Sequence, residues 1–172
     1  MQQRHVGRSG LRVSRTGLGT MTWGRDTDRH EAAALLADFT DAGGTLLDTG
    51  DAYGDAYGDG AAEVVLGELV GEVVRRDEVV LVTKAGAAGP GRRPDTSRRG
   101  LLASLDASLD RLGTDHVDLW LVAGWDPATP LEETLAAADT AVSSGRTRYL
   151  GLARHTGWQT AAAACWQRAV PG

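Results

Sequence analysis

The sequence predicts an α/β protein built on a parallel sheet, and three observations carry that prediction. Short apolar runs end near Gly19, Asp48, Lys84, Val122 and Gly151, and a segment with helical periodicity follows each of them. The runs arrive roughly every 30–40 residues, which is the spacing of βα units. They are apolar on both faces, as buried parallel strands are. A doubly wound sheet and a (β/α) barrel both fit this rhythm, and periodicity alone leaves the two open.

The first elements follow from local signals. Alternating residues over 5–13 predict a hairpin. Asp28 with Glu31 has the pattern of a capping box at a helix start, and Gly43-Gly44 ends that helix. The apolar positions that we expect on one face of this helix are Ala32, Leu35, Leu36 and Phe39.

Four further helices are expected between and after the later strands. The second begins near Asp59 and is marked by Val64, Val65, Leu69, Val73 and Val74. The third is marked by Leu101, Leu102, Leu105, Leu109 and Leu112. Thr129-Pro130-Leu131-Glu132 predicts a capping box with proline at the first helical position, which opens a fourth helix that Gly145 ends. A fifth helix runs from Gly157 towards Arg168.

Composition limits the classes of function. The 172 residues, 42% hydrophobic and 24% charged, predict a single domain over 1–172 with a real core. Basic residues number 18 against 23 acidic ones, and the net charge of −5 argues against nucleic-acid and anionic-membrane partners. Cys165 is the single cysteine, so we expect no disulfide framework and no metal site. The chain lacks an apolar stretch of membrane length and a signal-peptide core, so we expect a cytoplasmic protein.

Lys84 is the first candidate for chemistry, because it is the single lysine in a chain with seventeen arginines. It lies at the end of an apolar run, the preceding strand ends at Asp48, and Tyr53 follows five residues later. An isolated buried ammonium is costly. We therefore expect these three residues to converge at the carboxyl ends of the strands, with the ammonium within hydrogen-bond reach of the carboxylate. The alternative is a buried ion pair without chemistry.

Motifs along essentially the whole chain decide between the doubly wound sheet and the (β/α) barrel. They include Gly17-Leu18-Gly19-Thr20-Met21, Leu47-Asp48-Thr49 with Tyr53-Gly54, Thr83-Lys84, Ser108-Leu109-Asp110-Arg111-Leu112-Gly113, Val117-Asp118-Leu119-Trp120, Trp125-Asp126-Pro127 and Gly145-Arg146-Thr147-Arg148-Tyr149-Leu150-Gly151. In this order they closely resemble the aldo-keto reductases. No strand is followed by the G-x-G-x-x-G turn of a Rossmann site.

The resemblance implies a TIM-type (β/α)8 barrel, incomplete here, that transfers hydride from NADPH to an aldehyde or ketone. In that family a tyrosine protonates the developing alkoxide, a lysine makes the phenol a better acid, an aspartate holds the lysine, and a histidine orients the carbonyl. By position, the implied catalytic residues are Tyr53, Lys84 and Asp48. The implied cofactor-binding residues are Gly19, Thr20 and Asp48.

The tyrosine has a competitor, because Asp51-Ala52-Tyr53-Gly54 is repeated at once as Asp55-Ala56-Tyr57-Gly58. Counting from Asp48 selects Tyr53, whereas the sequence leading into the next helix also fits Tyr57. We favour Tyr53, since a strand anchors Asp48 more firmly than a loop anchors the residues after it.

Two substitutions depart from the family pattern. Ala123 stands where the family has its histidine, and a methyl group cannot orient a carbonyl. Ala153-Arg154 stands where a Ser-Asn pair binds the nicotinamide carboxamide. Of the other histidines, His155 alone lies just beyond a strand end, and we expect a surface or helix-start role for it.

The chain contains about five βα units, whereas a barrel of this class needs about 250 residues. An open set of strands leaves two edges unpaired and an apolar interior exposed, so we expect self-association or a partner that covers the open barrel edge.

Three functions remain open from the sequence. The first is an aldo-keto reductase-type oxidoreductase, truncated or degraded, acting on a small-molecule carbonyl substrate. The second is a cofactor-independent acid/base enzyme, such as a dehydratase, isomerase or cyclase, using Tyr53, Lys84 and Asp48. The third is a non-catalytic partner subunit. Binding of reduced dinucleotide separates the first from the others.

Overall fold

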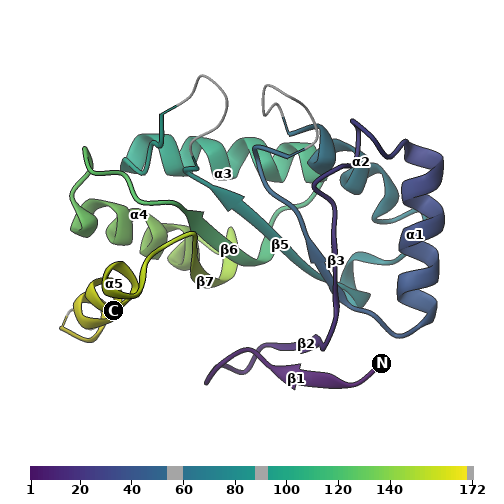
Figure 1. Cartoon of the computed structure of the whole chain (residues 1–172), viewed down its shortest axis with the longest axis horizontal. Coiled ribbons are helices and arrows are strands. Elements are labelled where there is room, and N and C mark those ends of the chain that lie inside the picture. The colour runs from purple at the N-terminus through teal and green to yellow at the C-terminus, as the bar shows by residue number, and fades with distance from the viewer. Residues whose placement is uncertain (54–59, 88–92, 170–172) are drawn as a thin grey trace.

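The computed structural model describes residues 1–53, 60–87 and 93–169 (Figure 1). Within them the elements are, in chain order, β1 (Gln3–His5), β2 (Arg12–Ser14), β3 (Gly17–Gly19), α1 (Arg29–Asp41), β4 (Leu46–Asp48), α2 (Ala61–Leu69), the 3-10 turn η1 (Arg76–Glu78), β5 (Val80–Ala85), α3 (Arg98–Leu112), β6 (Val117–Ala123), α4 (Leu131–Ser143), β7 (Thr147–Ala153) and α5 (Gly157–Ala169). The predicted hairpin is confirmed as β1 and β2, which pair antiparallel. None of the described helices is long and apolar enough to cross a membrane.

Strand order decides the architecture. The five-stranded sheet runs β3-β4-β5-β6-β7, and every neighbouring pair is parallel. A doubly wound sheet reverses its order at a switch point, whereas a (β/α) barrel adds each strand beside the preceding one. The structure is therefore an incomplete (β/α)8 barrel of five βα units, preceded by a hairpin, as predicted.

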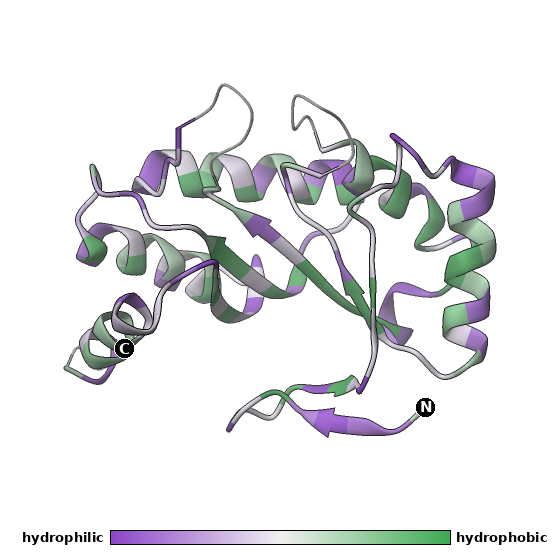
Figure 2. Ribbon diagram, in the orientation of Figure 1, coloured by the Kyte–Doolittle hydropathy of each residue, from purple (hydrophilic) through white to green (hydrophobic). Residues whose placement is uncertain are grey.

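The two faces of the sheet differ in burial. Leu47, Leu81 and Trp120 are at most 1% exposed and point towards the helices, each of which packs on the next along one side of the sheet (Figure 1). Alternate residues face the barrel interior, and they include the half-buried Leu46, Val80, Leu119 and Leu121. Figure 2 shows most of the strands as hydrophobic and the helices as alternately hydrophobic and hydrophilic, as this layered packing requires.

The helix predictions are confirmed for α1, α3 and α5, with one error. Asp28 accepts a hydrogen bond from the Glu31 amide at 2.9 Å and caps α1. Leu35, however, is 42% exposed while Leu36 is fully buried. The buried positions of α1 are Ala32 and Leu36, and Leu35, which points about 100° away from Leu36, falls outside this core-facing stripe.

Two further helix predictions are wrong at their ends. α2 ends at Leu69, and Val73 and Val74 lie beyond it, because Val70 is extended with a ψ of 119° and Gly71 follows with a φ of 103°. α4 has no side-chain cap, since the Thr129 hydroxyl donates instead to Asp126 Oδ2 at 2.7 Å. The expected start of the second helix at Asp59 lies outside the described residues.

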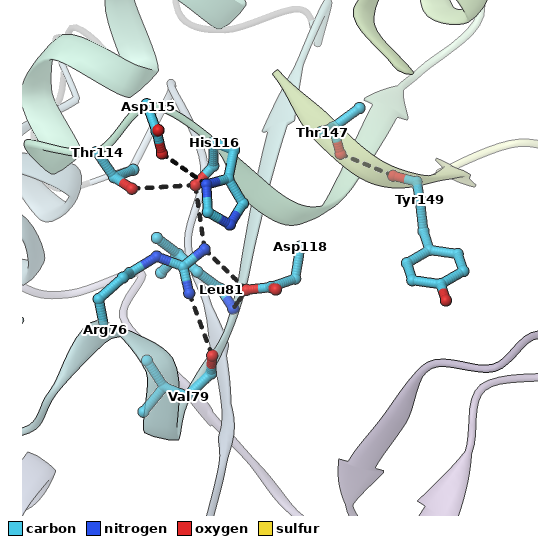
Figure 3. Close-up of polar contacts among 9 residues, drawn as sticks. All are labelled: Arg76, Val79, Leu81, Thr114, Asp115, His116, Asp118, Thr147 and Tyr149. Carbon is cyan, nitrogen blue, oxygen red and sulfur yellow. Dashed lines mark hydrogen bonds and ion pairs between the residues drawn. The ribbon is translucent and has the colours of Figure 1, made fainter. Parts of the chain in front are cut away.

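Side-chain networks close the amino-terminal ends of the strands. Asp118 of β6 accepts the Leu81 amide of β5 at 2.8 Å and pairs with Arg76 at 2.9 Å (Figure 3). Arg76 also donates to the carbonyls of Val79 and His116. These contacts lie at the end of the strands opposite to Lys84. The functional site that the sequence predicts lies at the other, carboxyl-terminal end.

The hairpin is latched to the same amino-terminal end. Ser14 Oγ accepts the amides of Thr45 and Leu46 at 2.9 and 3.2 Å, and the Ser14 amide donates back to Thr45 Oγ1 at 3.0 Å. Two hollows of about 300 Å³ each, both lined by Thr45 and Glu78, also lie at this end. Neither is near Lys84, so we assign them no role in the predicted chemistry.

Candidate active site

Asp48 and Lys84 meet at the carboxyl ends of β4 and β5. Asp48 lies opposite Val82 in the parallel register, and Lys84 is the next residue of β5 that faces the barrel interior. The Lys84 ammonium donates to Asp48 Oδ1 at 2.7 Å and to the carbonyl of Thr49 at 2.8 Å. The Lys84 side chain is 13% exposed and that of Asp48 39%, so the pair lies at the rim of the interior. The predicted ion pair is confirmed.

Tyr53 completes the cluster. The Lys84 Nζ lies 4.8 Å from the centroid of the Tyr53 ring, within cation–π distance. Gly50 lies against the same ring and against the Lys84 stem, because a β-carbon there would be 3.5 Å from Tyr53 Cε1 and 3.6 Å from Lys84 Cβ. The structure thus brings Tyr53 to Lys84 as predicted. The competing Tyr57 lies outside the described residues.

Main-chain hydrogen bonds fix the segment that carries Tyr53 to β5. The Thr49 amide donates to the Val82 carbonyl at 2.9 Å and the Asp51 amide to the Lys84 carbonyl at 3.1 Å. The Tyr53 amide then turns back to the Gly50 carbonyl at 3.1 Å. The segment between strand and tyrosine therefore continues the edge of the sheet.

Sequence reasoning missed one anchor of this segment. Asp51 is 8% exposed, and its Oδ2 accepts the Ser104 hydroxyl of α3 at 2.7 Å. A second carboxylate three residues after Asp48 was a visible signal. Its partner was not, because only the tertiary packing of α3 brings Ser104 to the loop.

The residues expected to bind a cofactor lie beside the pair but differ in access. Gly19 is exposed and is the register partner of Asp48, and the space where its β-carbon would stand is open. Thr20 is fully buried, and its hydroxyl and amide both donate to the Asp48 carbonyl, at 3.2 and 3.0 Å. Thr20 thus holds the main chain of Asp48, and a cofactor role for these residues stays a prediction.

The two departures from the family pattern are neighbours in space. Ala123 and Ala153 are register partners at the carboxyl ends of β6 and β7, and Ala123 is 2% exposed. Arg154 follows with a φ of 58°, the one positive φ outside glycine among the described residues. Two methyl groups and an exposed guanidinium therefore occupy this part of the rim.

His155 lies between the end of β7 and the start of α5. Its Nδ1 lies 2.8 Å from the Ala153 carbonyl, and its ring meets that of Trp125 edge-on at 6.3 Å. Trp125 in turn contacts Trp158, which is 63% exposed at the start of α5. A surface or helix-start role for His155 stays a prediction.

Asp126 supports the loop between β6 and α4. Burial works to raise its pKa, but hydrogen bonds from the Thr129 hydroxyl and from the amides of Ala128 and Thr96 together hold the pKa below the ordinary 3.8. Asp126 is 8% exposed and joins the start of α3 to the start of α4. It is a structural carboxylate at the carboxyl-terminal end of the barrel.

The chain is similar in sequence to known proteins. The sequence model of the Aldo/keto reductase family matches residues 15–170. "Uncharacterized oxidoreductase YrpG" of Bacillus subtilis (strain 168) is 35% identical over 165 residues, 92% of this chain and 51% of that protein. "L-glyceraldehyde 3-phosphate reductase" of Escherichia coli (strain K12) is 38% identical over 161 residues, 91% of this chain and 46% of that protein.

A solved structure agrees with these matches. The thermostable aldo-keto reductase Tm1743, crystallised with the inhibitor epalrestat, superposes with a TM-score of 0.82 at 32% identity, over 96% of this chain and 58% of that one. The chain spans about half the length of the curated relatives that it matches.

Proposed function

This chain belongs to the aldo/keto reductase family, and we propose that it supplies the proton-donating half of an NADPH-dependent oxidoreductase that reduces an aldehyde or ketone. The observation that carries the proposal is the Lys84 ammonium held between the Asp48 carboxylate at 2.7 Å and the Tyr53 ring at 4.8 Å. That cluster lies at the carboxyl ends of the strands, where barrels of this class place their active sites.

Each residue has a distinct part in the proposed reaction. The Tyr53 hydroxyl passes its proton to the oxygen of the substrate carbonyl as that carbon is reduced. The phenolate left behind is stabilised by the nearby Lys84 ammonium, which lowers the cost of losing the proton. Asp48 and the Thr49 carbonyl hold the ammonium at two points, 4.8 Å from the centroid of the Tyr53 ring.

The described residues fit the cofactor in part. When bound, NADPH supplies a hydride in this family, and the open space beside Gly19 next to Asp48 suits a close approach to the main chain. The carboxamide end is different, because the Ala153 side chain has no hydrogen-bonding group and the Arg154 side chain has donors but no acceptor. We therefore propose that this chain by itself holds the dinucleotide weakly.

The same two departures favour a second candidate. Tyr53, Lys84 and Asp48 lie together, whereas the register partners Ala123 and Ala153 carry only methyl groups. A dehydration, isomerisation or cyclisation needs a positioned acid and base and no dinucleotide. This cofactor-independent chemistry is our alternative for the site.

The open barrel supports a further part of the proposal. In the part of the chain that the structure describes, β3 and β7 each have one neighbour in the sheet, and leucines of the interior face are half-buried. Unpaired strand edges and exposed apolar surface favour association. We propose that the chain self-associates or meets a partner along these edges, and a non-catalytic subunit is the limiting case.

A titration tests the cofactor proposal. Purified chain is titrated with NADPH while the fluorescence of its five tryptophans is followed, and the same sample is sedimented. We expect weak binding and an associated species. Tight binding by a monomer would overturn this part of the proposal, because it requires a cofactor site that Ala153 and Arg154 do not provide.

Turnover then separates the candidate functions. NADPH oxidation with simple aldehydes supports the reductase, and conversion of a substrate without dinucleotide supports the acid/base enzyme. A stable complex without either supports the non-catalytic subunit. Tyr53→Phe is the matched inactive control, since it removes one hydroxyl and keeps the ring that packs on Lys84.

A further inference from the structure

A second buried carboxylate lies outside the proposed chemistry. Glu63, in the first turn of α2, is 0% exposed and forms its ion pair with Arg111, whereas Lys84 pairs with Asp48. Both of its oxygens are used, because Oε1 accepts the Thr83 hydroxyl and Oε2 accepts Arg111 Nε at 2.7 Å. A charged group without water is costly, so contacts of this quality on both oxygens indicate a fixed position.

Arg111 makes this anchor rigid on the side of α3. Its guanidinium also donates to the Ser108 hydroxyl at 3.2 Å. It lies against the main chain of Gly60, where a β-carbon would collide with it, and Gly60 takes a φ of 79° as it opens α2. The start of α2 is therefore clamped to α3 through Glu63 and Arg111.

The clamped turn holds the main chain of Tyr53. The amide of Ala62, the residue before Glu63, donates to the Tyr53 carbonyl at 3.2 Å. Together with the bond from the Tyr53 amide to the Gly50 carbonyl, this fixes the tyrosine on both sides. One of those two bonds depends on where Glu63 places the first turn of α2.

The other oxygen of Glu63 reaches the lysine strand. Thr83 directly precedes Lys84 in β5, and neighbouring strand residues point to opposite faces. Thr83 is fully buried on the helix side while Lys84 points into the barrel interior. A bond that fixes the Thr83 side chain thus sets the rotation of the strand at Lys84.

We propose that Glu63 is a positioning residue that sets Tyr53 and Lys84 relative to each other from the helix side of the sheet. Because its side chain is fully buried, we assign it no contact with substrate or cofactor. Its effect passes through Ala62 to the tyrosine and through Thr83 to the lysine. The inference rests on the proposed function only in taking Tyr53 and Lys84 as the reacting pair, and the geometry that it describes is measurable without turnover.

The single lysine provides the measurement. Protein labelled with ¹³C and ¹⁵N at lysine gives one set of side-chain signals, all from Lys84. The Tyr53 ring, 4.8 Å from Nζ, displaces those signals through its ring current. Movement of the ring relative to the ammonium therefore appears as a shift of the Lys84 signals in the folded protein.

Four variants make the test specific. Glu63→Gln and Thr83→Val each break the connection, and Thr83→Ser restores the hydroxyl. Glu68→Gln is the matched control on the same helix, since Glu68 is 52% exposed and pairs with Arg29 at the surface. We expect the Lys84 signals to shift in the first two variants, to return to the wild-type position in Thr83→Ser, and to stay unchanged in Glu68→Gln.

If Glu63 has only a structural role, the expected result is different. In that case Glu63→Gln and Thr83→Val lower the unfolding midpoint while the folded protein keeps the wild-type Lys84 signals, and this outcome overturns the proposal. If Glu63→Gln does not fold, the pair Thr83→Val and Thr83→Ser decides, because valine keeps the shape of threonine. Failure of the reductase proposal would appear separately, as a missing effect of Tyr53→Phe on turnover.

Discussion

Replacing Arg154 with glycine should stabilise the protein, although it removes a large side chain. Arg154 is exposed, makes no hydrogen bond or ion pair among the described residues, and has a φ of 58°. A residue with a β-carbon loses about 1–2 kcal/mol in the left-handed region. Glycine avoids that strain but loses about 0.5–1 kcal/mol more chain entropy on folding. The net expectation is a gain of about 0.5–1 kcal/mol in the free energy of unfolding.

Urea unfolding followed by tryptophan fluorescence measures this gain, at one fixed protein concentration so that association does not contribute. For a chain of this length the gain corresponds to an increase of about 1–4 °C in Tm. Arg154→Ala keeps the β-carbon and should gain nothing. Arg148→Gly, at an exposed position inside β7, the strand that Arg154 directly follows, has no positive φ to relieve and should lose about 0.5–1 kcal/mol. Equal stability of Arg154→Gly and Arg154→Ala would refute the argument from backbone strain.

Three further predictions concern the site and its support. Tyr53→Phe should abolish turnover and leave the fold intact, and activity lost instead in Tyr57→Phe would show that the second repeat carries the acid. Ala123→His should raise the rate of carbonyl reduction by up to about 10²–10³-fold, which is the usual effect of one preorganised hydrogen-bond donor, but only in preparations that bind NADPH. Equal rates for wild type and variant would show that the donor is dispensable. Because the pKa of Asp126 is lowered in the folded state, its contribution to stability is present above the ordinary value of 3.8 and is lost as the pH falls through the folded pKa. Asp126→Asn should therefore lose less unfolding free energy than wild type across that acid window, as measured by urea unfolding at successive pH values.

Much of the site was predictable because its charged residues lie at the ends of two neighbouring strands. A lysine at the end of an apolar strand needs a carboxylate, and parallel strands bring their carboxyl ends to one edge. Asp48 was the candidate at the end of the neighbouring strand, and the 2.7 Å contact confirms the pair. The position of Tyr53 followed from the short distance along the chain. Its catalytic role stays a prediction.

The rest depended on packing that periodicity does not encode. Leu35 and Leu36 are equally apolar, and only the helix orientation selects Leu36 for the core. The contacts of Ser104 with Asp51 and of Arg111 with Glu63 join α3 to segments far away in the sequence. Such pairs require the register of helix on sheet, which a single sequence does not supply.

The strand order has a consequence for assembly. Since β3, β4, β5, β6 and β7 pair only in chain order, each strand finds its partner one βα unit earlier, at a comparable loop-closure cost. The sheet can therefore grow unit by unit as the polypeptide emerges from the ribosome, with every new strand docking on a finished edge. For the same reason, a cut of the chain between two βα units interrupts the pairing of only one pair of strands. Separately expressed pieces of such a barrel can therefore reassemble along that one pair of strand edges.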